Sequence, residues 1–265
     1  MPVASLQTWQ QELEQACMMC GGLFSRVMVV SEASSTQDVA REKCDGKAGL
    51  IVTALRQTAG RGRLGRSWAD TCHLGVAISF VVDASKFGPG VLSLAAGLAA
   101  AWTIGDVVDE DGKGLIGIKW PNDVVERKSA KKLAGVLIEQ AGGLAVVGIG
   151  INVRQQLEDL APEIADLATS LAMMGTDVDR LTVASKLILR LNVALSLSKD
   201  QIVSEWTKLD VLRGTKRTFE HSGSQFSGIV AEIDPLGNIV LTLENGDKKA
   251  LPALATTLVK EQAKR

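Results

Sequence analysis

The chain has 265 residues, of which 46% are hydrophobic and 22% charged, so it is long enough for one large domain or for a large and a small one. Its 29 basic and 30 acidic side chains give a net charge of -1, which excludes a global electrostatic preference for nucleic acid or anionic membranes. The apolar stretch Val91 to Gly105 is too short to span a bilayer, and polar residues between Gln10 and Glu14 stand where a signal peptide needs an apolar block. We therefore expect a cytoplasmic protein in which any anion binding is local.

The first predicted elements are a helix, a strand and a second, shorter helix. Apolar residues recur at helical spacing over residues 5 to 20, and Gly21-Gly22 ends that helix. The run Arg26 to Ser31 is typical of a buried strand. The hydroxyl-rich run Ser34-Ser35-Thr36-Gln37-Asp38 then opens a helix that reaches about Lys43. One hydroxyl suffices to cap a helix, so three at a strand end indicate either a cap alone or a polar ligand contact as well.

A segment rich in glycine and arginine separates two apolar strands, Leu50 to Leu55 and Gly75 to Val82. From Gly60 to Arg66 it reads Gly-Arg-Gly-Arg-Leu-Gly-Arg. This spacing approaches both the dinucleotide fingerprint and the phosphate-binding P-loop, but each of those motifs requires a helix to begin there, whereas a strand follows here. Glycine permits close backbone approach and arginine offers a planar set of donors, so the segment is either a solvated hairpin tip or an anion clamp.

A lysine ends a later predicted strand. A buried helix over residues 91 to 108 is followed by the apolar strand Leu115 to Trp120, which carries Lys119 near its end. Pro121-Asn122-Asp123 then favours a turn. Lys119 either reaches solvent by snorkelling or meets an anion. The charged run Glu126 to Lys131 is typical of a solvated hairpin tip.

Two more apolar strands, Lys132 to Glu139 and Leu144 to Ile151, complete the predicted sheet. The second ends in Gly148-Ile149-Gly150-Ile151-Asn152. The small residues leave room for a flat ligand. The side-chain amide of Asn152 can form hydrogen bonds with the polar edge of that ligand.

Beyond these strands the pattern becomes helical and then changes to short strands. Helical periodicity predicts helices over residues 157 to 174, 181 to 197 and 200 to 210. From about Gly214 short strands alternate with turn signals, which predicts a small all-β module. We therefore divide the chain into a large domain, residues 1 to 212, and a small β domain, residues 213 to 265.

The inventory of reactive side chains is narrow. There are two histidines, His73 and His221, and no tyrosine, and no serine, histidine and aspartate spacing indicates a hydrolase. Cys17-x-x-Cys20 has the spacing of a redox or metal motif, but no second pair completes a zinc site, so we expect buried thiols and assign no metal ligand. The cationic and small polar groups that remain at strand ends suit phosphoryl or nucleotidyl transfer.

Taken together, these motifs resemble the biotin protein ligases. Those that carry the resemblance are, in chain order, Ser35-Thr36-Gln37, the segment Gln57 to Trp68, Lys119-Trp120-Pro121-Asn122-Asp123, Lys132-Leu133-Ala134-Gly135 and Gly148-Ile149-Gly150-Ile151-Asn152. A Trp206-x-Lys208-Leu209-Asp210 run ahead of a small β module is also similar to that family. The resemblance favours an anion clamp over a hairpin tip, and a ligand contact over solvent for Lys119.

The resemblance implies an α+β fold with a mixed central sheet and helices, of the class II aminoacyl-tRNA synthetase and biotin ligase type, and a C-terminal SH3-like β-barrel. It implies an enzyme that activates biotin with ATP to biotinyl-5′-AMP and transfers biotin to a lysine of a biotin carboxyl carrier domain, as in acetyl-CoA carboxylase. Mg²⁺ is expected with ATP, and its ligands are not assigned.

Nucleic acid and membranes are not expected among the partners, and a homodimer is left open. The first predicted strand begins as early as Arg26, with no basic region ahead of it, which predicts the monofunctional type without a DNA-binding domain.

The resemblance also implies roles for individual residues. The catalytic residues would be Lys119, Arg61 and Arg63. Biotin would contact Ser35, Thr36, Gln37, Gln57, Gly60, Arg61, Gly62, Arg63, Lys119 and Gly135. ATP and the adenylate would contact Arg63, Arg66, Trp68, Asn122, Gly150 and Asn152, with Asn152 at the adenine edge. The glycine- and arginine-rich segment would close over the adenylate and protect it from water.

Four positions depart from the family pattern. Gln37 stands where the family often has Asn, Leu64 where a basic residue is frequent, His73 where Gly is expected and Ala77 where Tyr is common. Of these, His73 would be bulkier than Gly beside the ligand loop, so the sequence leaves its effect and that of Ala77 on the pocket wall open. Two other functions stay open: a lipoate or octanoate ligase of the same fold, and a non-catalytic biotin-binding module.

Overall fold

A mixed seven-stranded sheet forms the centre of the structure. The computed structural model describes residues 4–62, 65, 67–68, 73–88, 90–108 and 114–259. The strand order is β1-β2-β3-β7-β6-β5-β4, in which β1 and β2 are parallel and the other neighbouring pairs are antiparallel. The strands are β1 (Arg26–Ala33), β2 (Leu50–Gln57), β3 (Gly75–Asp83), β4 (Ile116–Lys119), β5 (Asp123–Glu126), β6 (Lys132–Ala141) and β7 (Leu144–Asn152). The mixed sheet that the sequence predicts is confirmed.

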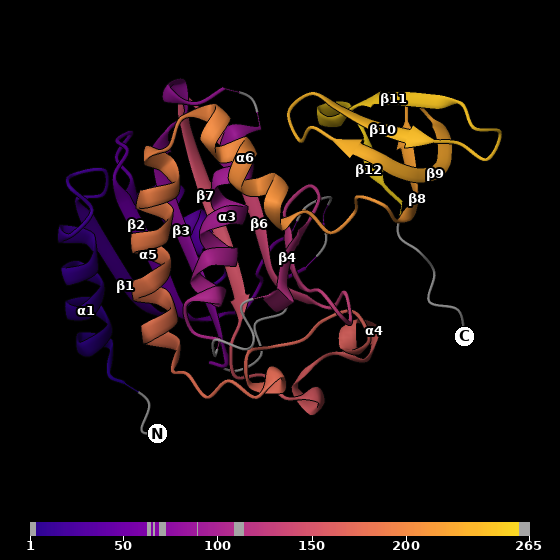
Figure 1. Cartoon of the computed structure of the whole chain (residues 1–265). Helices are drawn as coiled ribbons and strands as arrows, with labels where there is room; N and C mark the ends of the chain where they lie inside the picture. Colours follow the sequence, from indigo (N-terminus) through magenta and orange to yellow (C-terminus); the bar gives the residue numbers. More distant parts are fainter. Residues whose placement is uncertain are drawn as a thin grey trace.

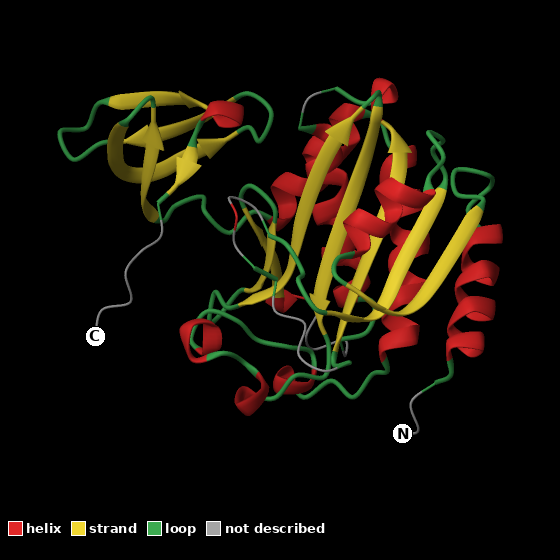
Figure 2. Ribbon diagram, turned by 180° about the vertical axis from the view of Figure 1, so that it is seen from behind, coloured by secondary structure: helices red, strands yellow, loops and turns green. Residues whose placement is uncertain are grey.

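Helices cover the two faces of this sheet unequally. Figure 1 shows α3, α5 and α6 in front of the strands, whereas the view from behind in Figure 2 leaves much of the sheet visible. The helices are α1 (Leu6–Met18), α2 (Thr36–Lys43), α3 (Val91–Gly105), α4 (Pro162–Ala165), α5 (Arg180–Ser196) and α6 (Lys199–Leu209). Because side chains alternate along a strand, Ile51 of β2 joins the large core under α1, α3 and α5, while Val52 joins a small cluster under α2.

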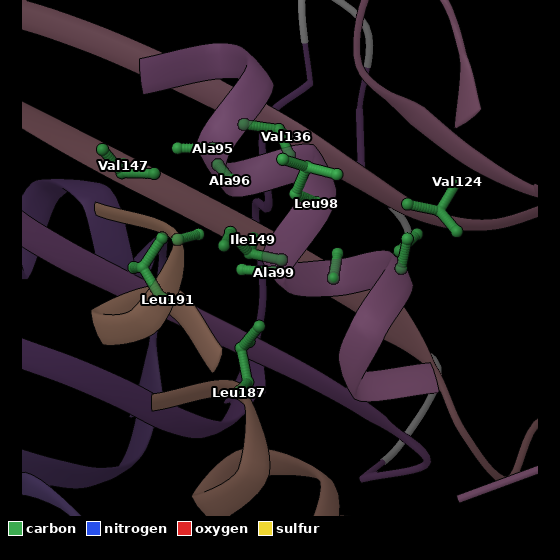
Figure 3. Close-up of a cluster of buried hydrophobic side chains, with 14 of the residues drawn as sticks. Ala95, Ala96, Leu98, Ala99, Val124, Val136, Val147, Ile149, Leu187 and Leu191 are labelled. Carbon is green, nitrogen blue, oxygen red and sulfur yellow. The ribbon is translucent and has the colours of Figure 1, made fainter. Parts of the chain in front are cut away.

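Helix α3 is buried along almost its whole length. Figure 3 shows Ala95, Ala96 and Ala99 of this helix beside Ile149 of β7, with Leu187 of α5 close by. Small side chains let α3 approach both the sheet and the outer helices. This close packing supports β6 and β7 from one face of the sheet. No described helix, α3 included, has the length and hydropathy needed to cross a membrane.

A second sheet follows at the C-terminal end of the chain. Its order is β11-β10-β9-β8-β12, and its strands are β8 (Lys216–His221), β9 (Ser224–Ile233), β10 (Asn238–Thr242), β11 (Lys248–Pro252) and β12 (Thr257–Leu258). Phe219 of β8 packs on Trp120, with ring centroids 6.1 Å apart, and so joins the module to the central sheet. Every pair of neighbouring strands is antiparallel, and β11 and β12 are the two edges. The predicted all-β module is confirmed as an open sheet, but its closure into a barrel is not.

One predicted helix is wrong, and one strand was not predicted. Residues 157 to 174 do not form one helix: the short helix α4, which begins at Pro162, lies between the 3-10 helices Leu157–Asp159 and Ala172–Met174. The Thr169 backbone nitrogen bonds to the carbonyl of Lys132 instead of continuing a helix. Strand β5, Asp123–Glu126, lies between the predicted turn at Asn122-Asp123 and the predicted hairpin tip, and the turn that follows Glu126 confirms that tip. Four residues are too few for a recognisable period.

Cys17 and Cys20 are buried in the large core, as expected. Burial, with a smaller contribution from Glu14, raises the pKa of Cys17. Burial, with a smaller contribution from Cys17, raises the pKa of Cys20 to about 11. These are the properties of structural thiols rather than of a redox pair.

Candidate active site

Small residues cover one face of the sheet where β3, β7 and β6 lie side by side. Strand alternation places on this face Ala77, Ser79, Gly135, Leu137, Gly148 and Gly150. The register aligns Gly150 with both Ala77 and Gly135, and aligns Gly148 with Ser79. The missing side chains leave a cavity of about 190 Å³ above the strands.

The walls of this cavity come from elements that are far apart in the sequence. One wall is the N-terminus of α2, at Ser35 to Gln37, and another is the turn from Lys119 to Asp123 between β4 and β5. The C-terminal module contributes Thr256 to Val259. The site is therefore completed by both sheets.

The α2 wall carries a chain of buried hydroxyl and amide groups. The backbone nitrogen and the hydroxyl of Thr36 donate to Gln57 Oε1, at 2.8 and 3.2 Å. Ser79 Oγ donates to Thr36 Oγ1 at 2.8 Å. Ser35 caps α2 by accepting from the backbone nitrogen of Gln37 at 3.3 Å. All these side chains are buried, so the cavity holds a prearranged polar surface.

The side chain of Gln37 lies over Gly148 with half of its amide unused. Its Nε2 donates to the carbonyls of Leu137 and Val146, at 3.2 and 3.4 Å. A Cβ at position 148 would lie 3.0 Å from that nitrogen, so a glycine there makes room for the amide. The Oε1 atom is buried and accepts no hydrogen bond from any described residue. Leaving such an acceptor unpaired costs about 1–3 kcal/mol, which a ligand donor would recover once the amide turns Oε1 toward the cavity.

The stem of the glycine- and arginine-rich segment brings Trp68 onto the floor of the cavity. The backbone nitrogen of Trp68 donates to the carbonyl of Gly60 at 2.8 Å. The indole packs against Gly135 and Gly150: a Cβ on Gly135 would lie 3.2 Å from the ring, and one on Gly150 would overlap it. The small residues at this strand end thus accommodate an aromatic wall from the chain itself.

Two lysines reach the cavity, one from β4 and one from β6. Lys132 pairs with Asp123, with 2.6 Å between Nζ and Oδ1, and its Nζ lies 5.5 Å from the centroid of the Trp68 ring. Lys119 lines the same cavity, and its side-chain Nζ forms neither a hydrogen bond nor an ion pair with another described residue. A cation without a counter-ion beside partly buried groups attracts an anionic ligand.

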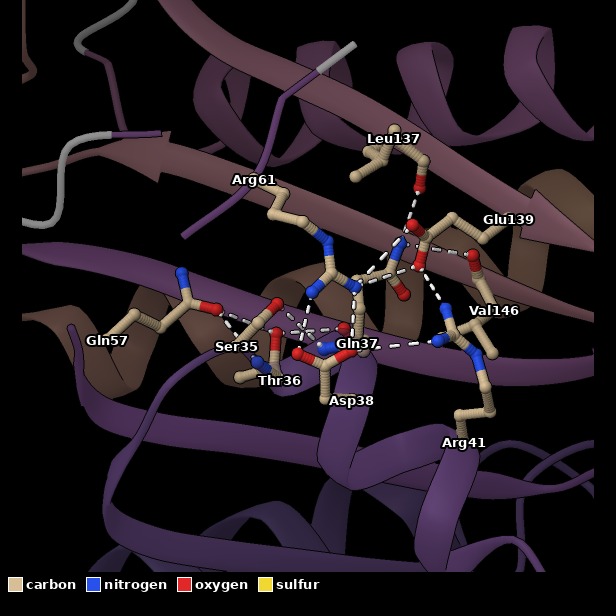
Figure 4. A network of polar contacts seen from close by, with 11 residues as sticks. Ser35, Thr36, Gln37, Asp38, Arg41, Gln57, Arg61, Leu137, Glu139 and Val146 are labelled. Carbon is tan, nitrogen blue, oxygen red and sulfur yellow. Dashed lines mark hydrogen bonds and ion pairs between the residues drawn. The ribbon is translucent and has the colours of Figure 1, made fainter. Parts of the chain in front are cut away.

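Arg61 is held by two carboxylates (Figure 4). Its Nη1 and Nη2 donate to Asp38 at 2.6 and 2.8 Å, and Nη2 also donates to Glu139 Oε2 at 3.1 Å. Arg41 donates to the same Glu139 oxygen at 2.6 Å. The hydrogen bond from Arg61 holds the pKa of Asp38 below its usual value, and the bond to Asp38 raises the pKa of Arg61.

Comparison with known proteins gives the family. The profile of the Biotin/lipoate A/B protein ligase family matches residues 30–156. The biotin–[acetyl-CoA-carboxylase] ligase of Mycobacterium tuberculosis is 33% identical over 243 residues, covering 88% of this chain and 89% of that protein. The chain belongs to the biotin protein ligase family.

Other biotin protein ligases support this assignment. The bifunctional ligase/repressor BirA of Bacillus subtilis is 32% identical, over 83% of this chain and 70% of that protein. The biotin protein ligase of Aquifex aeolicus in complex with biotin and ATP superimposes with a TM-score of 0.77 at 28% identity, covering 90% of this chain and 100% of that one.

The cavity brings together most of the residues that the family resemblance assigned to the site. Those in its lining are Ser35, Thr36, Gln37, Gln57, Arg61, Gly62, Trp68, Lys119, Asn122, Gly135 and Gly150. Gly60 lies outside the lining and supports it through its bond to Trp68. Arg63 and Arg66 lie outside the described residues, so their contacts stay predictions.

Two residues singled out from the sequence lie elsewhere. Asn152 is absent from the lining, because its Nδ2 donates to the carbonyls of Lys132 and Thr169, at 3.3 and 2.9 Å. His73 is also absent from the lining: the residue is exposed, and its Nδ1 lies 2.9 Å from the carbonyl of Leu55. Its φ of 64° lies in the left-handed region, which explains why a glycine would suit the position.

Three parts of the wall were missed. Lys132 opens the Lys-Leu-Ala-Gly run, of which only Gly135 had been assigned, so the motif itself was the available signal. Asp123 also lines the cavity, although its sequence context favours only a turn; its position at the end of a motif shared with the family is the available signal. No sequence signal indicated Thr256 to Val259, because their contact depends on how the second sheet docks.

Proposed function

We propose that the chain is a biotin–[acetyl-CoA-carboxylase] ligase, which activates biotin with ATP to biotinyl-5′-AMP and transfers biotin to a lysine of a biotin carboxyl carrier domain. The unpartnered acceptor of Gln37, beside the buried groups of Ser35 and Thr36, carries this proposal. The head group of biotin is a cyclic urea with two N–H donors and one carbonyl acceptor. A buried wall with an unused acceptor and neighbouring hydroxyls complements that pattern.

The same wall argues against a lipoate or octanoate ligase. Those acyl groups end in a dithiolane ring or a methyl group, neither of which donates a hydrogen bond. They would leave Gln37 Oε1 buried and unpaired, and sites built to hydrogen-bond a ligand reject analogues that lack the donor by large factors.

The opposite side of the cavity suits the anionic groups of the reaction. Adenylation brings the biotin carboxylate against the α-phosphate of ATP, so negative charge accumulates at one point. Lys119 has no other partner among the described residues and would meet this charge directly. Lys132 would exchange its bond to Asp123 for the ligand anion. Fixed cations that face developing charge are among the strongest catalytic devices of proteins.

The adenylate would lie along the wall formed by Trp68, Gly150 and Asn122. Asn152 remains the candidate for the adenine edge on condition that its amide releases the carbonyl of Lys132 or Thr169. The predicted contacts of Arg63 and Arg66 with the adenylate complete the assignment.

Mg²⁺ would enter with ATP. Among the described residues, no three His, Cys, Asp or Glu side chains are grouped to hold a metal ion. Asp123 is the one carboxylate in the described lining of the cavity. This set fits an ion that takes most of its ligands from phosphate oxygens and water, as Mg²⁺ usually does.

We further propose that residues 1 to 212 are the biotin- and ATP-binding domain and that residues 213 to 265 are an SH3-like domain. The end of α6 at Leu209 and the start of β8 at Lys216 support this boundary. Because Thr256 to Val259 line the cavity, the small domain would shape the site that the carrier lysine enters. The cytoplasm would supply both ATP and the carrier.

Exchange of labelled pyrophosphate into ATP tests the proposal. We expect exchange that depends on biotin, is not stimulated by lipoate, and is followed by transfer of biotin to a purified carrier domain. Gln37→Met should raise the KM for biotin at least tenfold, whereas Gln140→Met, at an exposed glutamine, should leave it unchanged. Exchange that lipoate stimulates would show that lipoate and not biotin is the substrate. Biotin binding without exchange would indicate a non-catalytic binding module.

A further inference from the structure

Arg61 ties the stem of the glycine- and arginine-rich segment to two other elements. Its guanidinium meets Asp38 on α2 in a two-point contact and Glu139 on β6 in a second contact, which Figure 4 shows together. Arg41 crosses to Glu139 from the same helix, and its Nη1 lies 3.6 Å from Asp38. The carboxylates are remote from each other in the sequence, so only the folded chain brings them to one arginine.

The stem that Arg61 holds is short and carries the aromatic wall of the cavity. Arg61 and Ser67 form an isolated antiparallel bridge, and Gly60 accepts the hydrogen bond of Trp68 next to it. A displacement of Arg61 would therefore move Trp68 relative to Gly150, on which its indole rests.

The charge of Arg61 is already balanced in this arrangement. An arginine that served the transferring phosphate would first have to leave Asp38 and Glu139. Lys119, in contrast, has no partner among the described residues and can meet an anion without breaking a contact. Arg61 is therefore the cation that anchors the stem, and Lys119 is the cation that is available to the reacting anions.

The geometry points to Asp38 and Glu139 as positioning residues that act through Arg61: they hold the stem against the sheet, so that ATP meets a wall that is already assembled. The kinetic consequence rests on the proposed function, whereas the contact itself does not. Assembly of the wall lowers the ordering cost that the protein pays on binding, so it acts on the KM for ATP and leaves the chemical step unchanged. The three side chains are 31% to 41% exposed, so salt should weaken the contact.

Trypsin cleavage after Arg61 tests the contact without reference to catalysis. Trypsin must take the arginine side chain into its own pocket, so an Arg61 held by carboxylates is protected. We expect Asp38→Asn and Glu139→Gln to speed cleavage of the Arg61–Gly62 bond several-fold at low salt, and 0.5 M salt to remove most of the difference. Asp38→Glu should restore protection. The matched control is Glu42→Gln, on the same helix, where Glu42 pairs with the exposed Lys43.

Steady-state kinetics of the same variants test the positioning role. Asp38→Asn and Glu139→Gln should each raise the KM for ATP about three- to tenfold, with kcat within about twofold of the parent chain. A fall in kcat at unchanged KM would overturn the inference and make Arg61 a group of the chemical step. Cleavage that is identical in all variants would overturn it as well. A parent chain without biotin-dependent exchange would refute the proposed function, and the cleavage result would still decide the contact.

Discussion

The indole of Trp68 rests on Gly150 so closely that this position of β7 has no room for a side chain. Gly150→Ala should therefore push the indole off the strand and open the wall of the cavity. Overpacking of this kind costs about 1–3 kcal/mol, so we expect the KM for ATP to rise about tenfold or more, as measured by pyrophosphate exchange. Gly105→Ala is the matched control, because a Cβ there meets no atom within 4 Å. An unchanged KM for ATP in Gly150→Ala would show that Trp68 is not part of the adenylate wall.

Substitution of the two lysines of the cavity should slow adenylation to different extents. Lys119→Met removes a cation without a partner among the described residues, and we expect adenylation to slow on the order of 10²-fold. Lys132→Met also leaves Asp123 without its counter-ion, so a negative charge would face the incoming anions and the loss should be larger. Single-turnover formation of biotinyl-5′-AMP measures both rates.

Lys128→Met, at an exposed lysine in the turn after β5, is the control for the lysine pair. It should leave adenylation at the parent rate. If Lys132→Met were the milder of the two cavity variants, the lysine paired with Asp123 would be a structural group.

Local patterns in the sequence predict much of this fold because they reflect local physics. The glycines that end α1, the hydroxyl cap at Ser35 and the alternation along β7 each act within a few residues. The alternation also places Gly148 and Gly150 on one face, which is why small residues at that strand end predicted a ligand surface. The group that lies flat on these glycines is the indole of Trp68 from the chain itself, and only the tertiary structure shows this contact.

The parts that could not be predicted depend on register and docking. Lys131 and Lys132 are adjacent, and the irregular pairing of Val125 with Lys132 decides which of them faces the cavity. Arg61 looked like a free phosphate ligand, because nothing near it in the sequence shows that Asp38 and Glu139 reach it.

Cys20 should be unreactive near neutral pH. With a pKa of about 11, only about one thousandth of this thiol is ionised at pH 8, whereas an unperturbed cysteine is ionised to roughly one quarter. Alkylation of Cys20 in the folded chain should therefore be on the order of 10²-fold slower than in the chain unfolded by urea, and it should rise about tenfold per pH unit up to pH 10. Peptide mapping by mass spectrometry resolves the individual cysteines. Rapid labelling of folded Cys20 at pH 8 would reopen a redox role for the Cys17-x-x-Cys20 pair.

Asp38 should make the stability of the chain depend on pH in the acid range. The hydrogen bond from Arg61 lowers the pKa of Asp38 in the folded chain, and the other charged groups that face it are Arg41 and Glu139. A carboxyl with a depressed folded pKa stabilises the protein fully above its unfolded pKa of about 3.9, and this contribution is lost as the pH falls through the lower folded value. Asp38→Asn should therefore lower Tm by about 1–3 °C at pH 7, and the difference from the parent chain should shrink as the pH falls below about 4. Scanning calorimetry of the parent chain, Asp38→Asn and the control Glu42→Gln between pH 3 and 8 measures this difference. A Tm difference that persists unchanged at pH 3 would mean that Asp38 stabilises the stem by its shape and not by its charge.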